Sequence, residues 1–150
     1  SVAVPYLIAL LRRPEEPLRQ TALDALQELT STTFLVTGYE ANADQYEAWF
    51  RAHRQGGDRA WFRDALARRG YDTTAMAGYV QGAADLAAVP VLLKAMRDDD
   101  AVVRKNADVA LRRISGESFG VVERTTPRED SVTVANRWSG WWMRTGAKLK

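Results

Sequence analysis

Cysteine is absent from this chain of 150 residues, and histidine occurs only once, at His53. Without cysteine there can be no disulfide and no thiolate metal site, but the redox compartment stays open because a helical protein needs no disulfides. No apolar run approaches the ~20 residues of a membrane-spanning helix, so we expect no membrane span. The first residues lack the charged region and the cleavage site of a signal peptide. The localisation is undetermined from these features; we expect a soluble protein, with the cytoplasm slightly favoured.

A strong charge of one sign is lacking as well. The 21 basic and 19 acidic residues give a formal net charge of +2. They are interspersed over most of the length, whereas a nucleic-acid-binding domain usually gathers its basic residues in one stripe. The composition is close to the average of globular proteins, which excludes a disordered chain. The chain has no initiator Met and begins at the edge of a repeat, so we expect a mature form or a fragment of a longer protein.

Two stretches of the sequence are copies of one another. Val4–Phe34 and Val89–Phe119 align without a gap at an offset of 85 residues. In each copy, apolar residues recur at the spacing of one helix face, an acidic turn follows, and a second amphipathic stretch carries small alanines on its inner face. This pattern predicts two helical hairpins. Each hairpin buries one face only and therefore needs a neighbour against which to stack.

An aromatic cluster follows each hairpin at helical spacing, and its offset between the copies rises to 92 residues. The clusters are Tyr46, Trp49 and Phe50 in the first copy, and Trp138, Trp141 and Trp142 in the second. Thr126 and Glu129 have the spacing of a capping box with Pro127 between them, which predicts a helix that runs to about Arg144. Between the copies, Asp58 to Arg69 is predicted to form a helix and Thr73 to Val80 a shorter partner helix.

The sequence therefore predicts an all-α fold, an α-solenoid of about three antiparallel helical hairpins with additional aromatic-rich helices. We expect residues 1–150 to form a single repeat domain. Its first repeat would cover about 2–54, a degenerate repeat about 58–84, and the third repeat about 87–145.

The second copy resembles a known family of helical repeats. The stretch from Asp100 to Leu111 resembles the second-helix (helix B) signature of HEAT repeats, and 87–93 resembles the start of their first helix. The segment 111–120 followed by Trp-x-x-Trp-Trp at 138–142 looks like a variant common in bacterial HEAT-repeat proteins. The first copy departs from the pattern, with Thr21 at the position of Asn106 and Ser31 at that of Gly116. The resemblance implies a HEAT-like superhelical scaffold that binds macromolecules, usually proteins, through helix B, and it carries no catalytic residues.

Several side chains have both a structural and a functional interpretation. The aromatic clusters could form a ligand cage, but their recurrence favours packing in the core. Arg19 and Arg104 occupy equivalent positions, where HEAT repeats commonly place an arginine that bonds a neighbouring acidic turn; phosphate binding is the alternative. The acidic run 98–100 favours helix capping over a cation site, because calcium loops space their ligands along a longer loop. A lone His53 is poor grounds for catalysis.

The exposed side of helix B remains as the predicted surface for a partner. The candidate partner-binding residues there are Gln20, Asp24, Gln27, Lys105, Asp108 and Arg112. We predict no catalytic, cofactor-binding or metal-binding residues and no cofactor. The expected function is a non-catalytic scaffold for protein–protein interaction. The alternatives are an α-solenoid that binds the nucleic-acid backbone and, less favoured, a HEAT-like lyase or glycosylase.

Overall fold

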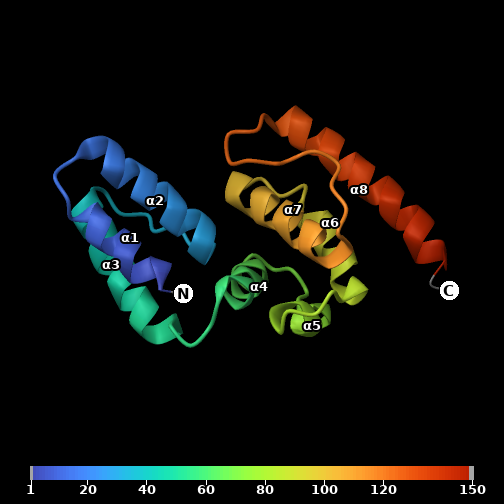
Figure 1. The fold of residues 1–150 in the computed structure, drawn as a ribbon, viewed down its shortest axis with the longest axis horizontal. Helices are drawn as coiled ribbons and strands as arrows, with labels where there is room; N and C mark the ends of the chain where they lie inside the picture. Colours follow the sequence, from blue (N-terminus) through green and yellow to red (C-terminus); the bar gives the residue numbers. More distant parts are fainter. Residues whose placement is uncertain (1, 149–150) are drawn as a thin grey trace. The chain divides into compact units, whose positions relative to one another are not determined.

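The computed structural model describes residues 2–148, apart from the side chain at position 147. Residues 2–148 contain helices and connecting loops and no β-strand, which confirms the all-α prediction (Figure 1). The α-helices are α1 (Ala3–Leu11), α2 (Glu16–Thr30), α3 (Tyr39–His53), α4 (Asp58–Arg68), α5 (Ala77–Val80), α6 (Val89–Ala95), α7 (Ala101–Ser115) and α8 (Arg128–Lys148). Two short 3-10 helices, Thr74–Met76 and Leu86–Ala88, complete the secondary structure.

The chain forms two compact units, Ser1–Ala65 and Leu66–Lys150, and the division falls inside α4. We refer to them as the first and the second unit. Each contains one copy of the sequence repeat. A division of this kind is expected of repeat arrays, in which each repeat contacts only its neighbours. The single repeat domain over 1–150 stays a prediction.

The first unit has α1 in contact with both α2 and α3 (Figure 1). Its helix ends follow the sequence closely, since Pro5 lies in the first turn of α1 and Pro17 in the first turn of α2, where a missing N–H costs nothing. The core of this unit combines apolar residues from all three helices with one tryptophan of α4. Its buried members are Val4, Ile8, Leu11, Ala22, Leu26, Ala43, Tyr46 and Trp61.

The second unit repeats this arrangement, because α6 contacts both α7 and α8. The Asp100 carboxylate caps α7 by accepting from the N–H groups of Val102 at 2.8 Å and Val103 at 3.4 Å, as the acidic turn predicts. The inner face of α7 is fully buried at Ala107, Ala110 and Leu111. The order of first helix, second helix and aromatic helix thus recurs in both units.

The middle section departs from the predicted hairpin. In place of a partner helix over Thr73 to Val80, the chain forms a 3-10 turn and the single helical turn α5. The Asp72 carboxylate accepts from the Thr74 N–H and hydroxyl, and Gly82, at φ +88°, follows the end of the short helix. Met76 and Tyr79 are nevertheless buried.

The end of the second helix has the same backbone conformation in both copies although the residue differs. Ser31 follows α2 with φ 55° and ψ 27°, and its counterpart Gly116 follows α7 with φ 73° and ψ 1°. Glycine adopts this left-handed conformation at no steric cost, whereas a residue with a Cβ atom is strained in it. The repeat therefore preserves the helix end, and the first copy tolerates strain there.

Replacing Ser31 with glycine should raise the free energy of unfolding by about 1 kcal/mol, because it removes this strain. Urea denaturation followed by circular dichroism measures the change. The control is Thr33→Gly in the same connection, where φ is not positive. It should destabilise slightly, since glycine only adds freedom to the unfolded chain. If the two substitutions changed the free energy of unfolding equally, the backbone at Ser31 would not be strained.

Candidate functional site

The aromatic clusters are packed within each unit. Phe34 and Tyr46 meet edge to face in the first unit at a centroid distance of 4.7 Å and 78°. Phe119 and Trp138 repeat the contact in the second unit at 4.7 Å and 83°. Tyr46 and Trp138 are both fully buried, so the prediction that they are core residues is confirmed. Neither ring is open to a ligand.

The other members of the clusters are half-buried. Trp49 stacks on the His53 ring at a centroid distance of 4.5 Å and meets Trp61 edge to face at 5.2 Å. The Trp61 Nε1 donates to the His53 carbonyl oxygen at 3.0 Å. His53 thus ends α3 as a packing residue, in line with its sequence position. Trp141 and Trp142 are also only half-buried, so they are less central to the core than predicted.

Asp108 is the polar partner of the buried tryptophan. Its Oδ1 accepts from Trp138 Nε1 at 3.0 Å, and its Oδ2 accepts from Arg112 Nε at 3.0 Å and from the Val122 N–H at 3.3 Å. The Asp108 side chain is completely buried. These three donors join α7 to α8 and to the loop between them, and they compensate the cost of burying a carboxylate.

The predicted partner-binding face is therefore wrong at Asp108, which has no exposed surface. It is also wrong at Gln27, which is only 8% exposed. The sequence pattern placed both residues on the outer side of helix B, but it could not show that Trp138 would require a buried acceptor on α7. A group inside the core does not contact a partner.

In the second unit, the segment between α7 and α8 lies against part of the remaining face. Lys105 Nζ lies 3.7 Å from a carboxylate oxygen of Glu123 in this segment, and Val122 is fully buried beside Asp108. Arg112 is tied to Asp108, as described above. The second copy therefore uses Lys105, Asp108 and Arg112 to hold its own longer loop.

In the first unit, two of the predicted residues remain accessible. Gln20 is exposed and donates from Nε2 to Asp24 Oδ1 at 2.9 Å, and Asp24 is half-buried. The Tyr39 hydroxyl donates to Gln20 Oε1 at 3.0 Å. Gln20 and Asp24 thus form a small polar part of the predicted face that stays accessible.

The two equivalent arginines differ in their contacts. Arg104 is buried and donates to the backbone carbonyls of Asp98 at 2.8 Å and Asp99 at 3.0 Å. The predicted bond to an acidic turn is present, but the carbonyl groups accept it instead of the carboxylates. Arg19 pairs with Glu16 at 3.0 Å, and its guanidinium lies 4.6 Å from the centre of the Tyr39 ring. Both arginines serve packing in their own units.

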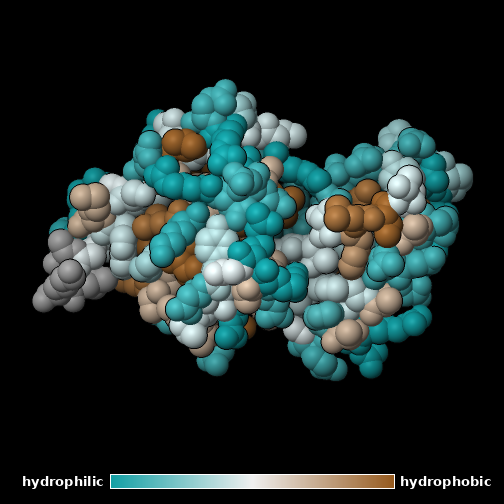
Figure 2. Space-filling view, turned by 180° about the vertical axis from the view of Figure 1, so that it is seen from behind, coloured by the Kyte–Doolittle hydropathy of each residue, from teal (hydrophilic) through white to brown (hydrophobic). Residues whose placement is uncertain are grey.

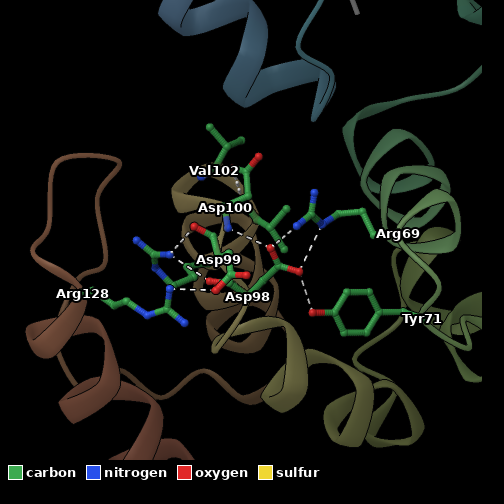
Figure 3. A network of polar contacts seen from close by, with 9 residues as sticks. Arg69, Tyr71, Asp98, Asp99, Asp100, Val102 and Arg128 are labelled. Carbon is green, nitrogen blue, oxygen red and sulfur yellow. Dashed lines mark hydrogen bonds and ion pairs between the residues drawn. The ribbon is translucent and has the colours of Figure 1, made fainter.

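Asp98 is the centre of a polar network that the sequence did not reveal (Figure 3). Arg69 donates to its two oxygens at 3.1 and 2.5 Å, the Tyr71 hydroxyl donates at 2.7 Å, and the Asp100 N–H donates at 2.8 Å. Asp98 is 8% exposed. The network connects the end of α4 to the turn between α6 and α7.

Charges and burial in this network shift the pKa values of Asp98 and Tyr71. Burial by itself would raise the pKa of the Asp98 carboxyl, but the hydrogen bonds from Arg69, the Asp100 N–H and Tyr71 outweigh it and hold the pKa below its usual value. Burial, followed by the hydrogen bond to Asp98, raises the pKa of Tyr71 to about 12. Asp98 is therefore ionised and Tyr71 is neutral near pH 7. This is a structural ion pair with an added donor.

We compared the chain with known proteins. No protein-family model, curated protein or solved structure matches it. The resemblance to HEAT repeats therefore rests on the quoted residues alone. Within residues 2–148, no helix has the length and apolar character required to cross a membrane. The same part of the chain holds no group of three or more metal-ligand side chains suited to an ion.

One further surface feature lies on α8. A pocket of about 450 Å³ opens along this helix within the second unit. It is lined by Phe119, Thr133, Asn136, Arg137, Gly140 and Arg144. From residue 131 to residue 148 the helix carries the cations Arg137, Arg144 and Lys148 and no Asp or Glu. A run of cations without a carboxylate on one helix is the sequence signal for this pocket, and it does not recur in the first copy.

Proposed function

We propose that this chain is a non-catalytic HEAT-like α-solenoid module that binds other proteins. The observation that carries the proposal is the recurrence of one three-helix arrangement whose buried polar groups bond within their own unit. Tyr46 donates to the Thr32 carbonyl at 2.5 Å in the first copy, and Trp138 donates to Asp108 in the second. The recurring residues thus maintain the fold. Stacked helical repeats typically present extended surfaces for macromolecules.

The small net charge, with basic and acidic residues interspersed, favours a protein over a nucleic acid as the partner. The net charge is +2, and α3 carries the exposed carboxylates Glu40, Asp44 and Glu47 around the guanidinium of Arg12, at 2.6 to 3.0 Å. Glu47 also lies 3.5 Å from Arg51, so three carboxylates face two arginines. A phosphate backbone would be repelled by such a face and attracted by the cations of α8. Proteins can complement both faces.

Binding measurements with purified components test this function. The recombinant chain is immobilised, captured proteins are identified by mass spectrometry, and each candidate is then purified and titrated by calorimetry. We expect at least one protein to bind with a defined stoichiometry. A labelled duplex and a labelled single strand are titrated in parallel at low ionic strength. Tight, salt-dependent binding of an oligonucleotide, with no purified protein bound, would instead establish the nucleic-acid alternative.

A further inference from the structure

Two arginines on the second half of α8 have no carboxylate partner in the part of the chain that the structure describes. Arg128, in the first turn of the helix, pairs with Asp99 at 2.8 Å (Figure 3). Arg137 and Arg144 are exposed, and no carboxylate within residues 2–148 pairs with either. Arg137 Nη1 donates to the Phe119 carbonyl oxygen at 3.1 Å. One helix therefore has a neutralised arginine at its start and two arginines open to an anion farther along.

The surroundings of these two arginines add to the positive character. Arg97, exposed at the end of α6, donates to Asn136 Oδ1 at 2.6 Å and brings a third guanidinium beside the pocket. Every titratable residue that lines the pocket is an arginine. Phe119 supplies an aromatic ring to the lining, held edge to face on Trp138. The pocket thus combines cations with an aromatic side chain. The face of the molecule in Figure 2 shows separate hydrophobic areas amid mostly hydrophilic side chains.

We propose that the α8 pocket binds an acidic, extended segment of a partner protein, with Arg137 and Arg144 pairing with its carboxylates. This rests on the proposed function and names its site and the chemistry of the partner. Arginine forks suit carboxylates, to which they can donate two parallel hydrogen bonds.

The spacing of the arginines fits such a segment. Arg137 and Arg144 are seven residues apart, which corresponds to about 10.5 Å along an α-helix. In an extended polyproline-II segment, residues three apart lie on the same side and about 9.3 Å apart. Two carboxylates at that separation can therefore meet the two guanidinium groups at once. Unfolded chains populate this conformation readily, so an acidic, disordered segment already presents the required geometry.

Nucleic acid fits the same pocket less well. Its affinity depends on the number of phosphates neutralised, and it falls steeply with salt. Only a few cations surround this pocket, and the chain as a whole carries +2. A short acidic peptide needs only two or three charge pairs and can also place an apolar side chain against Phe119.

The test uses the purified chain and defined peptides. A fluorescein-labelled peptide with two glutamates three residues apart is titrated at low salt, and its anisotropy is compared with that of a matched peptide with glutamines in their place. We expect the glutamate peptide to bind and the glutamine peptide to bind at least tenfold more weakly. Amide chemical-shift changes in the unmodified protein should centre on residues 133–144, which locates the site without any substitution.

Matched variants then assign the contact. Arg144→Gln and Arg137→Gln should each weaken binding about fivefold, and the double variant more than tenfold. Arg128→Gln on the same helix should leave the affinity unchanged, because that arginine is paired with Asp99. Circular dichroism verifies that each variant is folded.

Three results of the peptide experiments would overturn the proposal. The first is equal affinity for the glutamate and glutamine peptides. The second is amide chemical-shift changes that lie away from α8. The third is an oligonucleotide of equal charge that binds more tightly than the glutamate peptide and depends on the same arginines. A purified partner that binds the Arg137→Gln, Arg144→Gln double variant as well as it binds the unmodified chain would also remove the α8 site. In that last case protein binding itself would stand, so the two proposals fail separately.

Discussion

Replacing Trp138 with alanine should lower the free energy of unfolding of the second unit by about 3–5 kcal/mol. Trp138 is fully buried, and its ring packs edge to face on Phe119 and on Trp141 at centroid distances of 4.7 and 5.5 Å. Removing the indole leaves a cavity and also deprives buried Asp108 of a donor. Native-state hydrogen exchange of the α7 amides measures the loss in the unit concerned.

Two controls separate the parts of this effect. Trp138→Phe keeps most of the ring volume but removes the Nε1 donor to Asp108, so it should cost about 1–3 kcal/mol. Met143→Ala truncates a residue of α8 that is 75% exposed and should change the stability by less than about 0.5 kcal/mol. A Trp138→Ala effect as small as that of Met143→Ala would show that the aromatic cluster is not part of the core.

Asp98→Asn should lower the stability at pH 7 by about 2–4 kcal/mol. The substitution keeps the size of the side chain but replaces the carboxylate that Arg69, Tyr71 and the Asp100 N–H share. The amide can accept at one oxygen only, so at least one of the donors loses its partner. Chemical denaturation of the two proteins under identical conditions measures the difference.

The pH dependence of this difference has a definite sign. The folded-state pKa of Asp98 lies below its unfolded value, so its ionised form contributes stability above the unfolded pKa of about 3.9. That contribution is lost as the pH falls through the lower, folded-state pKa. The difference in free energy of unfolding between the unmodified protein and Asp98→Asn should therefore be largest near pH 7 and should become smaller below about pH 4. A gap that stays constant down to pH 3 would contradict an ionised Asp98 in the network.

The helices of the two copies were predictable because their determinants are local or repeated. Helical spacing of apolar residues, Pro5 and Pro17 in first turns, and the Asp100 cap each act within a few residues of where they stand. The recurrence of the aromatic spacing correctly indicated that Tyr46 and Trp138 are packing residues. These features depend on periodicity, which a sequence displays directly.

The polar interior was not predictable, because its partners are distant in the chain. Asp98 meets Arg69 across 29 residues, and Asp108 meets Trp138 across 30. On a helical projection Asp108 falls beside the solvent-facing residues of α7. The loop that buries it is the part of the second copy that has no counterpart of equal length in the first. Burial there depends on how an insertion folds back, and helical periodicity does not encode that.

The α8 pocket was missed for a different reason. A repeat displays the residues that the two copies share, and the arginines of the pocket are not shared. The residues that correspond to Arg137 and Arg144 at the offset of 92 are Gln45 and Ala52. Differences between the copies therefore contain the signal for a surface that only one of them has.

The bond between Asp108 and Trp138 also constrains how the two copies diverged. At the corresponding positions the first copy has Leu23 and Tyr46, and the Tyr46 hydroxyl bonds to the Thr32 carbonyl instead. If a common ancestor was duplicated, changing one pair into the other by single steps passes through an intermediate. That intermediate buries either a carboxylate without the indole or an indole N–H without its acceptor, at a cost of about 1–3 kcal/mol. The two positions are thus epistatic, and segments exchanged between the copies keep their stability only when both residues come from the same parent.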